Sequence, residues 1–152
     1  MLLYRMSKLR HADDLTGKGS ELSGGRWNKK GIPALYLAEN ISLSILETIV
    51  HSQKIADLYN RYVLSIEVPN ESFEFIDINN LPKNWNTTPW NNFTIGYGSK
   101  FLLSNKNLIL KIPSAVVPEE SIFLINPTHK NHHQIKLIKK RLFLPDNRLK
   151  LK

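Results

Sequence analysis

Three side chains that lie close together in the sequence have the chemistry to bind a dinucleotide and act on it. Arg26 follows a pair of glycines, Tyr36 lies in a short apolar stretch, and Glu47 falls in a segment with helical periodicity. A guanidinium carries five donors in a rigid fork that matches phosphate oxygens, and a tyrosine ring can stack on a planar heterocycle. A carboxylate can stabilise a sugar that becomes cationic as its glycosidic bond breaks.

The three together favour cleavage of an N-glycosidic bond, and NAD fits this chemistry. When nicotinamide leaves NAD, positive charge develops at the anomeric carbon of the ribose, and a carboxylate near the 2-hydroxyl stabilises it. Electrostatic stabilisation of this kind is often worth ~10²–10³ in rate. Nicotinamide leaves as a neutral molecule and needs no general acid, so one carboxylate is sufficient.

Each of these residues also has a purely structural interpretation. Arg26 could be a loop arginine packed on Trp27, Tyr36 a core tyrosine with a satisfied hydroxyl, and Glu47 a glutamate on a solvated helix face. Ser114, which follows Pro113, could donate to a ligand or simply end a strand in a turn. The functional interpretation rests on convergence, because a loop, the next strand and the next helix can meet at one cleft.

The local elements support that convergence. Residues 34–37 are bounded by turn residues and predict a short buried strand, and Asn40 or Ser42 can cap a helix that runs to about His51. On a helical wheel the apolar side chains cover about half of this helix. Glu47 falls at the margin of the apolar face with His51 one turn further on, so its carboxylate can face a cleft.

The remaining periodicity predicts a single α+β domain over residues 1–152 with a mixed or antiparallel β core and few helices. The Gly-rich segment 11–27 reads as mostly loop and 79–92 as irregular. A short helix is expected at 94–104, although Gly96 and Gly98 disfavour it. Further strands are expected at 2–6, 61–68, 73–78, 108–112, 121–125 and 135–143.

Composition narrows the classes of protein and site. The chain has no cysteine, which excludes disulfides and thiolate metal sites. Neither a membrane-spanning run nor a signal peptide is expected, which indicates a cytoplasmic protein without a membrane partner. His129, His132 and His133 lie close together, but no acidic or cysteine ligand stands at recognisable spacing, so no metal is expected.

The net charge of +8 is concentrated at the C-terminal end. Residues 129–152 carry eight basic side chains against Asp146 alone, which is +7, whereas residues 1–128 are almost neutral. The basic side chains could protect an exposed strand edge from aberrant pairing or bind phosphates or an acidic partner.

Beyond these observations, the sequence resembles the RES-domain toxins over nearly its whole length. The most specific matches are the run Gly24-Gly25-Arg26-Trp27-Asn28 and the later Pro113-Ser114-Ala115. The arginine, glutamate and serine for which the domain is named match Arg26, Glu47 and Ser114. Departures from the usual pattern are Lys29-Lys30 before Gly31 and the segment 97–101, which usually carries a tryptophan. The other matching positions are Tyr4-Arg5, the segments 11–14, 111–117, 126–129 and 143–146, and Gly17, Gly19, Gly31, Leu35-Tyr36, Leu46, Val50-His51, Ile95-Gly96, Arg148 and Leu149.

The resemblance implies a fold like that of the diphtheria-toxin type of ADP-ribosyltransferases and an enzyme that degrades NAD by phosphorolysis or hydrolysis. It assigns Arg26, Tyr36 and Glu47 to catalysis. NAD binding is assigned to Gly25, Trp27, Asn28 and Ser114. NAD is then the substrate, inorganic phosphate a possible co-substrate, and no cofactor is implied. The expected partner is an Xre-type helix-turn-helix antitoxin, with no direct binding of nucleic acid by the toxin itself.

Two alternatives remain open from the sequence. A mono-ADP-ribosyltransferase would use the same three side chains and attach ADP-ribose to a protein. A nucleic-acid-binding module would use the basic C-terminal segment, with Trp85 and Trp90 as stacking surfaces. The near-neutral charge of residues 1–128 is against the second alternative.

Overall fold

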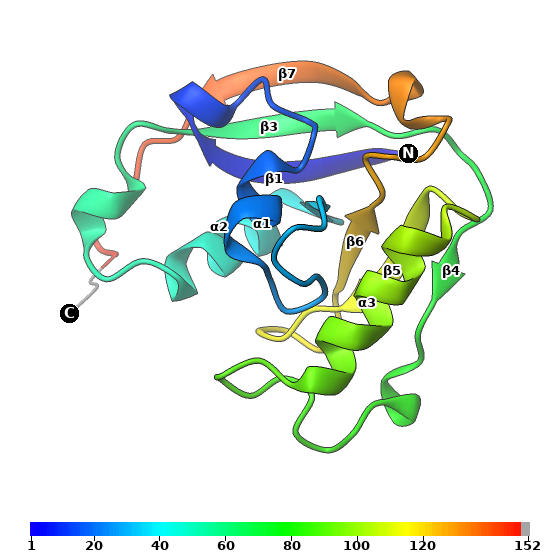
Figure 1. Cartoon of the computed structure of the whole chain (residues 1–152). Coiled ribbons are helices and arrows are strands. Elements are labelled where there is room, and N and C mark those ends of the chain that lie inside the picture. Colours follow the sequence, from blue (N-terminus) through cyan, green and yellow to red (C-terminus); the bar gives the residue numbers. More distant parts are fainter. Residues whose placement is uncertain (150–152) are drawn as a thin grey trace.

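The computed structural model describes residues 1–149, and its helices and strands follow an α+β order (Figure 1). The helices are α1 (Lys18–Ser23), α2 (Ile41–Val50) and α3 (Asn92–Ser104). The strands are β1 (Leu2–Lys8), β2 (Leu35–Ala38), β3 (Arg61–Glu67), β4 (Glu74–Phe75), β5 (Ile109–Pro113), β6 (Ser121–Ile125) and β7 (Lys136–Leu142). No helix in the described part of the chain is long and apolar enough to cross a membrane.

The seven strands form one sheet in the order β4-β5-β6-β2-β1-β3-β7. All neighbours in the sheet are antiparallel except β4 and β5, which are parallel. The predicted fold class, α+β with a mixed but mostly antiparallel core and few helices, is confirmed.

The sheet opens between β1 and β2. These two strands share the single registered pair Tyr4 and Ala38, whereas β1 and β3 share seven pairs and β2 and β6 share four. In Figure 1, β1, β3 and β7 run together across the top of the molecule, while β4 and β6 run steeply below them. Because β1 and β2 change direction where they meet, most of each strand has no strand beside it on this side.

Alternation of side chains along the strands builds two faces of the sheet. On β5 and β6, Leu110, Ile112 and Leu124 pack under α3 with Trp27, Trp85 and Phe101. Ile109, Phe123 and Ile125 point to the opposite face, where they join Leu35, Leu37, Leu64 and Ile66. A third cluster of Met6, Leu58, Val63 and Phe143 receives Ile41, Ile45 and Ile49 of α2.

Helix α2 begins where the sequence predicts. The Asn40 side chain accepts a hydrogen bond from the Leu43 backbone nitrogen at 2.7 Å, which caps the first turn. The apolar face is narrower than the wheel predicts, because Val50 is half exposed. Glu47 is partly exposed, as its place at the margin of that face predicts.

The segment predicted as loop contains α1, which tertiary contacts stabilise. The Ser20 hydroxyl accepts from the Ala34 nitrogen at 3.0 Å and donates to the Ala34 oxygen at 2.5 Å. Gly17 precedes the helix with a positive φ of 72°, and a Cβ there would lie 2.7 Å from the Ala34 backbone. The Gly-rich composition that argues against a helix therefore serves a close approach of two backbone segments.

The outer strands differ in length from the predicted ones. The strand predicted at 73–78 is only Glu74–Phe75, followed by a 3₁₀ turn at Ile78–Asn80. Strand β7 forms the other edge of the sheet and exposes Lys139, Lys140 and Arg141. Basic side chains on an edge strand fit the protective interpretation. Lys150 and Lys152, also part of the basic segment, lie outside the described residues.

Helix α3 is longer than predicted, and its glycines have different roles. Asn91 caps it by accepting from the Phe93 nitrogen at 2.8 Å. A Cβ on Gly98 would lie 2.0 Å from the Trp27 backbone oxygen, so the absence of a side chain lets α3 pack on Trp27. A Cβ on Gly96 would meet nothing within 4 Å.

These two glycines give a matched pair of substitutions. Gly98→Ala should lower the free energy of unfolding by at least about 1–3 kcal/mol, because the new methyl group overpacks against backbone. Gly96→Ala, two residues away on the same helix, should raise it by about 0.5–1 kcal/mol through helix propensity. Urea unfolding of both variants measures these changes. Equal effects of the two substitutions on the free energy of unfolding would contradict the close contact between Gly98 and Trp27.

Candidate active site

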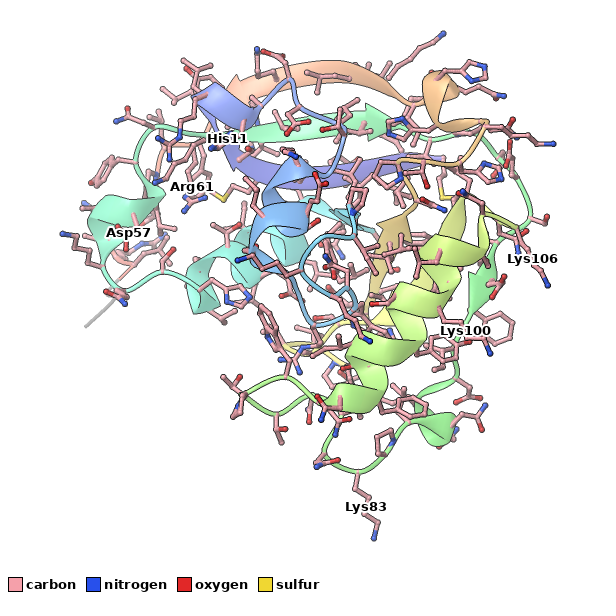
Figure 2. All side chains as sticks on the ribbon, viewed as in Figure 1. His11, Asp57, Arg61, Lys83, Lys100 and Lys106 are labelled. Carbon is pink, nitrogen blue, oxygen red and sulfur yellow. The ribbon has the colours of Figure 1, made fainter. Side chains whose placement is uncertain are left out.

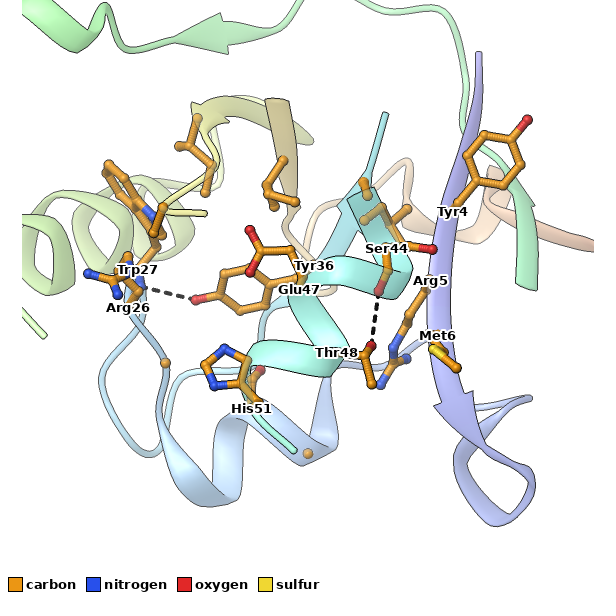
Figure 3. Close-up of a pocket in the computed structure, with 18 of the residues that line it drawn as sticks. Tyr4, Arg5, Met6, Arg26, Trp27, Tyr36, Ser44, Glu47, Thr48 and His51 are labelled. Carbon is orange, nitrogen blue, oxygen red and sulfur yellow. Dashed lines mark hydrogen bonds between the residues drawn. The ribbon is translucent and has the colours of Figure 1, made fainter. Parts of the chain in front are cut away.

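A cavity of about 500 Å³ lies at the opening between β1 and β2 (Figure 3). Its walls come from β1 and β2, from α1 and α2, from the turn that carries Arg26, and from the loops around Trp90 and Ala115. Strands β5 and β6 and Arg61 of β3 (labelled in Figure 2) complete the lining. Of the residues predicted for catalysis or NAD binding, the cavity is lined by Gly25, Arg26, Trp27, Tyr36 and Glu47. The structure thus brings the three predicted catalytic side chains together in one cavity, from a turn, a strand and a helix.

The turn Gly25–Asn28 sets the direction of Arg26. Its end residues exchange backbone hydrogen bonds, from Gly25 nitrogen to Asn28 oxygen at 2.9 Å and from Asn28 nitrogen to Gly25 oxygen at 3.3 Å. Arg26 and Trp27 therefore occupy the two central positions of a tight turn. Trp27 is only 2% exposed and packs its ring against Trp85 and Tyr97. Trp27 anchors the turn in the core, which leaves Arg26 at the cavity.

Arg26 is itself fixed to a distant loop. Its Nη1 atom donates to the backbone oxygens of Trp85 at 3.0 Å and Thr87 at 2.9 Å. Partial burial lowers the pKa of the guanidinium, and the nearby Glu47 carboxylate opposes that shift. The guanidinium is thus held in place while Nε and Nη2 make no hydrogen bond to any described residue.

The Tyr36 hydroxyl holds the same turn from β2. It accepts from the Trp27 nitrogen at 3.1 Å (Figure 3) and donates to Asn28 Oδ1 at 2.7 Å. Burial raises the pKa of this hydroxyl above its ordinary value, so it stays protonated at physiological pH. The single hydroxyl proton is directed to Asn28, and the ring faces the cavity. Stacking of that ring on a ligand stays a prediction.

Asn28 lies behind the cavity wall. Its Nδ2 atom donates to the backbone oxygens of Ser20 at 3.0 Å and Ile32 at 2.8 Å, and the residue is almost fully buried. Gly25 is required at this point, since a Cβ there would lie 2.6 Å from Asn28 Oδ1 and 2.8 Å from the Tyr36 hydroxyl. The geometry gives Asn28 a positioning role, and a direct contact with NAD stays a prediction.

The closest polar contact of Glu47 is with Ser114. The buried Ser114 hydroxyl donates to Glu47 Oε1 at 2.6 Å and accepts from the backbone nitrogens of Val116 and Val117 at 3.1 Å each. Two backbone donors fix the hydroxyl oxygen, so its proton points at the carboxylate. Ser114 therefore orients Glu47, and its predicted direct contact with NAD is untested by this arrangement.

Several cavity residues have no clear signal in the sequence. Trp90, which is 38% exposed, supplies an aromatic wall, while Trp85 is 5% exposed and belongs to the core. The two residues paired as stacking surfaces in the nucleic-acid alternative thus occupy different environments. Arg5 and His51 also line the cavity. His51 lies one helical turn after Glu47, and both Arg5 and His51 are among the positions at which the sequence resembles the RES-domain toxins.

Within residues 1–149, no group of three or more histidine and acidic side chains is placed to hold a metal ion. The histidines near the C-terminal end bond to backbone instead. His132 Nε2 lies 3.0 Å from the Leu15 oxygen, and His133 Nδ1 lies 2.7 Å from the Lys130 oxygen. Among the described residues that line the cavity, Glu47 is the only one with a carboxylate, and it lies among arginines and aromatic rings.

Comparison with known protein families decides the classification. The model of the RES domain matches residues 2–147. This chain belongs to the RES domain family. The resemblance seen in the sequence is confirmed.

Named relatives match most of the length of this chain. A Sphingobium sp. (strain YBL2) protein named "Prs ADP-ribosylating toxin" is 41% identical over 91% of this chain and 88% of its own. A protein named "Toxin Res" from Photorhabdus laumondii subsp. laumondii is 35% identical over 98% of this chain and 97% of its own. Another "Toxin Res", from Yersinia enterocolitica, is 39% identical over 86% of this chain and 87% of its own.

A solved structure shares the fold. A chain in the crystal structure of the M. tuberculosis MbcT–MbcA toxin–antitoxin complex superposes with a TM-score of 0.76 over 93% of this chain and 83% of that chain. The identity is 18%, so this likeness concerns the arrangement of helices and strands.

Substitution of Tyr36 tests whether its hydroxyl holds the turn. Tyr36→Phe should lower the free energy of unfolding by about 1–3 kcal/mol at neutral pH, because the Trp27 nitrogen and Asn28 Oδ1 lose their partner. The raised pKa of Tyr36 stabilises the fold fully below pH about 10, and this is lost as pH rises further, because the unfolded chain then ionises. The difference in the free energy of unfolding between wild type and Tyr36→Phe should therefore become smaller above pH about 10.

The control is Tyr59→Phe, at an exposed tyrosine outside the cavity. Denaturant unfolding between pH 7 and pH 11 measures both variants. A Tyr36→Phe protein as stable as the Tyr59→Phe protein would contradict the role given to the hydroxyl.

Proposed function

We propose that this RES-domain protein is the toxin of a toxin–antitoxin pair and that it cleaves the bond between nicotinamide and ribose in NAD. The observation that carries the proposal is the Glu47 carboxylate, oriented by the buried Ser114 hydroxyl, in a cavity that also holds Arg26 and Tyr36. It is the only carboxylate among the described residues that line the cavity.

In the proposed reaction the bond between the anomeric carbon and the nicotinamide nitrogen breaks, and its electron pair leaves with nicotinamide as a neutral molecule. The ribose becomes oxocarbenium-like, and Glu47 stabilises it through the 2-hydroxyl. Ser114 holds one oxygen of the carboxylate, which leaves the other for the sugar. Because Ser114 fixes the Glu47 carboxylate before the reaction, little reorganisation of the site is needed as positive charge develops on the ribose.

An acceptor oxygen then bonds to the anomeric carbon. Water as acceptor gives ADP-ribose after loss of one proton to solvent, and inorganic phosphate gives ADP-ribose-1-phosphate. Arg26 is proposed to bind the pyrophosphate through the guanidinium nitrogens that are not used by the loop. The Tyr36 ring and Trp90 are proposed as the aromatic walls for the substrate rings.

Family membership and the names of the relatives support the toxin assignment. An antitoxin partner is proposed because the chain shares its fold with a protein crystallised in a toxin–antitoxin complex. An antitoxin with an Xre-type helix-turn-helix is the form of partner that the resemblance implies, and the toxin is proposed to act in the cytoplasm, where NAD is available.

A second candidate function is transfer of ADP-ribose to a protein. The name of the 41% identical Sphingobium protein, "Prs ADP-ribosylating toxin", favours it. Both functions share the cleavage step and the same three side chains, and only the acceptor differs.

One experiment tests the cleavage and identifies the acceptor. Purified protein free of antitoxin is incubated with NAD, with and without inorganic phosphate, and the products are identified by phosphorus NMR. ADP-ribose-1-phosphate that forms only with phosphate means phosphorolysis, and ADP-ribose in both samples means hydrolysis. A parallel incubation of labelled NAD with cell extract shows transfer if the label enters a discrete protein band. Intact NAD in every sample, with folded protein, would refute the proposed function.

A further inference from the structure

Strand β7 forms an edge of the sheet with an open outer side. It stands last in the strand order, and in Figure 1 it runs along the upper margin of the molecule with no strand of the described residues beyond it. It is seven residues long, whereas β4 at the opposite edge has two. An edge strand of this length offers a row of unpaired N–H and C=O groups to which an extended segment can add.

The pairing of β7 with β3 identifies the backbone groups that face outward. Just after β7, the Phe143 nitrogen donates to the Arg61 oxygen at 2.8 Å, and the register continues along β7 from there without a shift through the residues named next. Bonded and non-bonded residues alternate along an antiparallel pair. Arg141 therefore also bonds to β3, whereas Lys140 and Leu142 direct their N–H and C=O groups away from the sheet.

Two of the four basic side chains on β7 have no acidic partner in the described structure. Both Lys139 and Arg141 are exposed, and neither forms an ion pair with a described residue. Their registered neighbours on β3 are Ser65 and Val63, which carry no charge. Because they are two residues apart, the two cations lie on the same face of the strand. A neighbouring strand with carboxylates at this spacing would gain two cross-strand ion pairs.

The other side chains of β7 add an apolar requirement. Ile138 and Leu142 are 57% and 45% exposed, which leaves two large apolar side chains at the edge. Leu142 lies on the same face as Lys140, which is already paired with Asp13 at 2.9 Å. The segment that fits β7 therefore alternates, with carboxylates on one face and apolar side chains on the other.

Two other occupants fit this edge less well. A second copy of the chain would set the cations of one β7 against those of the other, and like charges directly opposite each other destabilise a strand pair. The phosphates of a nucleic acid would neutralise the cations, but they offer no row of N–H donors for the outward carbonyl groups. The combination of free backbone groups and free cations favours an acidic peptide strand.

We propose that β7 is the docking edge for an acidic, extended segment of a partner protein, which adds to the sheet beside β7. The basic side chains then have two effects, because they prevent pairing with a second copy and select a strand of opposite charge. No residue of β7 lines the cavity, so the inference is independent of the proposed NAD chemistry.

Titration calorimetry with a synthetic peptide tests the charge selection. The probe is a peptide of about six residues that alternates glutamate and valine and is blocked at both ends. Wild type should bind it with a Kd below about 1 mM. The double variant Lys139→Gln/Arg141→Gln removes two cross-strand ion pairs, so the Kd should rise about 2- to 30-fold. The same peptide with lysine in place of glutamate should not bind.

The matched control is Lys83→Gln/Lys100→Gln. It removes the same amount of charge at two exposed lysines that lie away from β7 (Figure 2). This protein should bind the acidic peptide with the affinity of wild type, because the proposed attraction is local to the edge strand.

Amide hydrogen exchange of wild type tests the strand geometry. With the acidic peptide bound, the amides of Lys140 and Leu142 should exchange at least about tenfold more slowly, because they gain acceptors. The amides of Arg141 and Phe143 should change less, because they are bonded to β3 already. A peptide that is N-methylated at alternate residues cannot pair in this way, so its Kd should be at least about fivefold higher with the protein unchanged.

Four results would overturn the inference. The first is wild type that fails to bind the acidic peptide at about 1 mM. The second is peptide binding without the alternating amide protection, which would mean charge attraction alone. The third is a short RNA that binds more tightly than the peptide and loses affinity in Lys139→Gln/Arg141→Gln, which would assign the edge to nucleic acid. The fourth is self-association of wild type that protects the Lys140 and Leu142 amides, which would assign the edge to a second copy.

Discussion

The divergence of β1 and β2 is the constraint on which the site depends. These strands follow one another in the sequence and lie side by side in the sheet, but they pair only at Tyr4 and Ala38. Each strand keeps its full pairing on the other side, β1 with β3 and β2 with β6. The sheet therefore stays hydrogen-bonded while its centre opens, and the cavity forms there with Tyr36 on one strand and Arg5 on the other. Helix α2, which follows β2, places Glu47 at the same opening.

The side chains around this cavity hold one another in place. The Tyr36 hydroxyl fixes the turn that presents Arg26, and Arg26 in turn fixes the loop that carries Trp85 and Thr87. Ser114 uses two backbone donors to aim its hydroxyl at Glu47. Because these side chains depend on one another for their positions, a substitution behind the cavity wall should also displace the side chains that line the cavity. Through these hydrogen bonds the buried Asn28 and Ser114 contact Tyr36 and Glu47, which line the cavity.

Short-range patterns in the sequence predicted most of the elements, and they predicted that Arg26, Tyr36 and Glu47 would meet at one cleft. The Asn40 cap and the wheel of the following helix placed Glu47 at a cleft margin, and alternation identified β3, β5 and β6. Helix α1 was missed because its stability comes from the contact of Ser20 with Ala34, fourteen residues away. Arg5 is a position that matches the family, but neither Arg5 nor Trp90 has a local spacing that predicts its place at the cavity. Both reach the cavity only through the topology of the sheet and the loop before α3. The hydrogen bonds of the Tyr36 and Ser114 hydroxyls likewise depend on the fold, so the sequence alone does not predict them.

The rate of nicotinamide release from NAD by Glu47→Gln protein tests the central claim most directly. Glutamine keeps the size of the side chain and can still accept from Ser114, but it removes the negative charge that the reaction requires. We expect a loss of about 10²-fold or more in kcat, with a far-UV circular dichroism spectrum like that of wild type. Glu119→Gln, at an exposed glutamate outside the cavity, should release nicotinamide at the wild-type rate. Equal rates for folded Glu47→Gln and wild type would contradict the account.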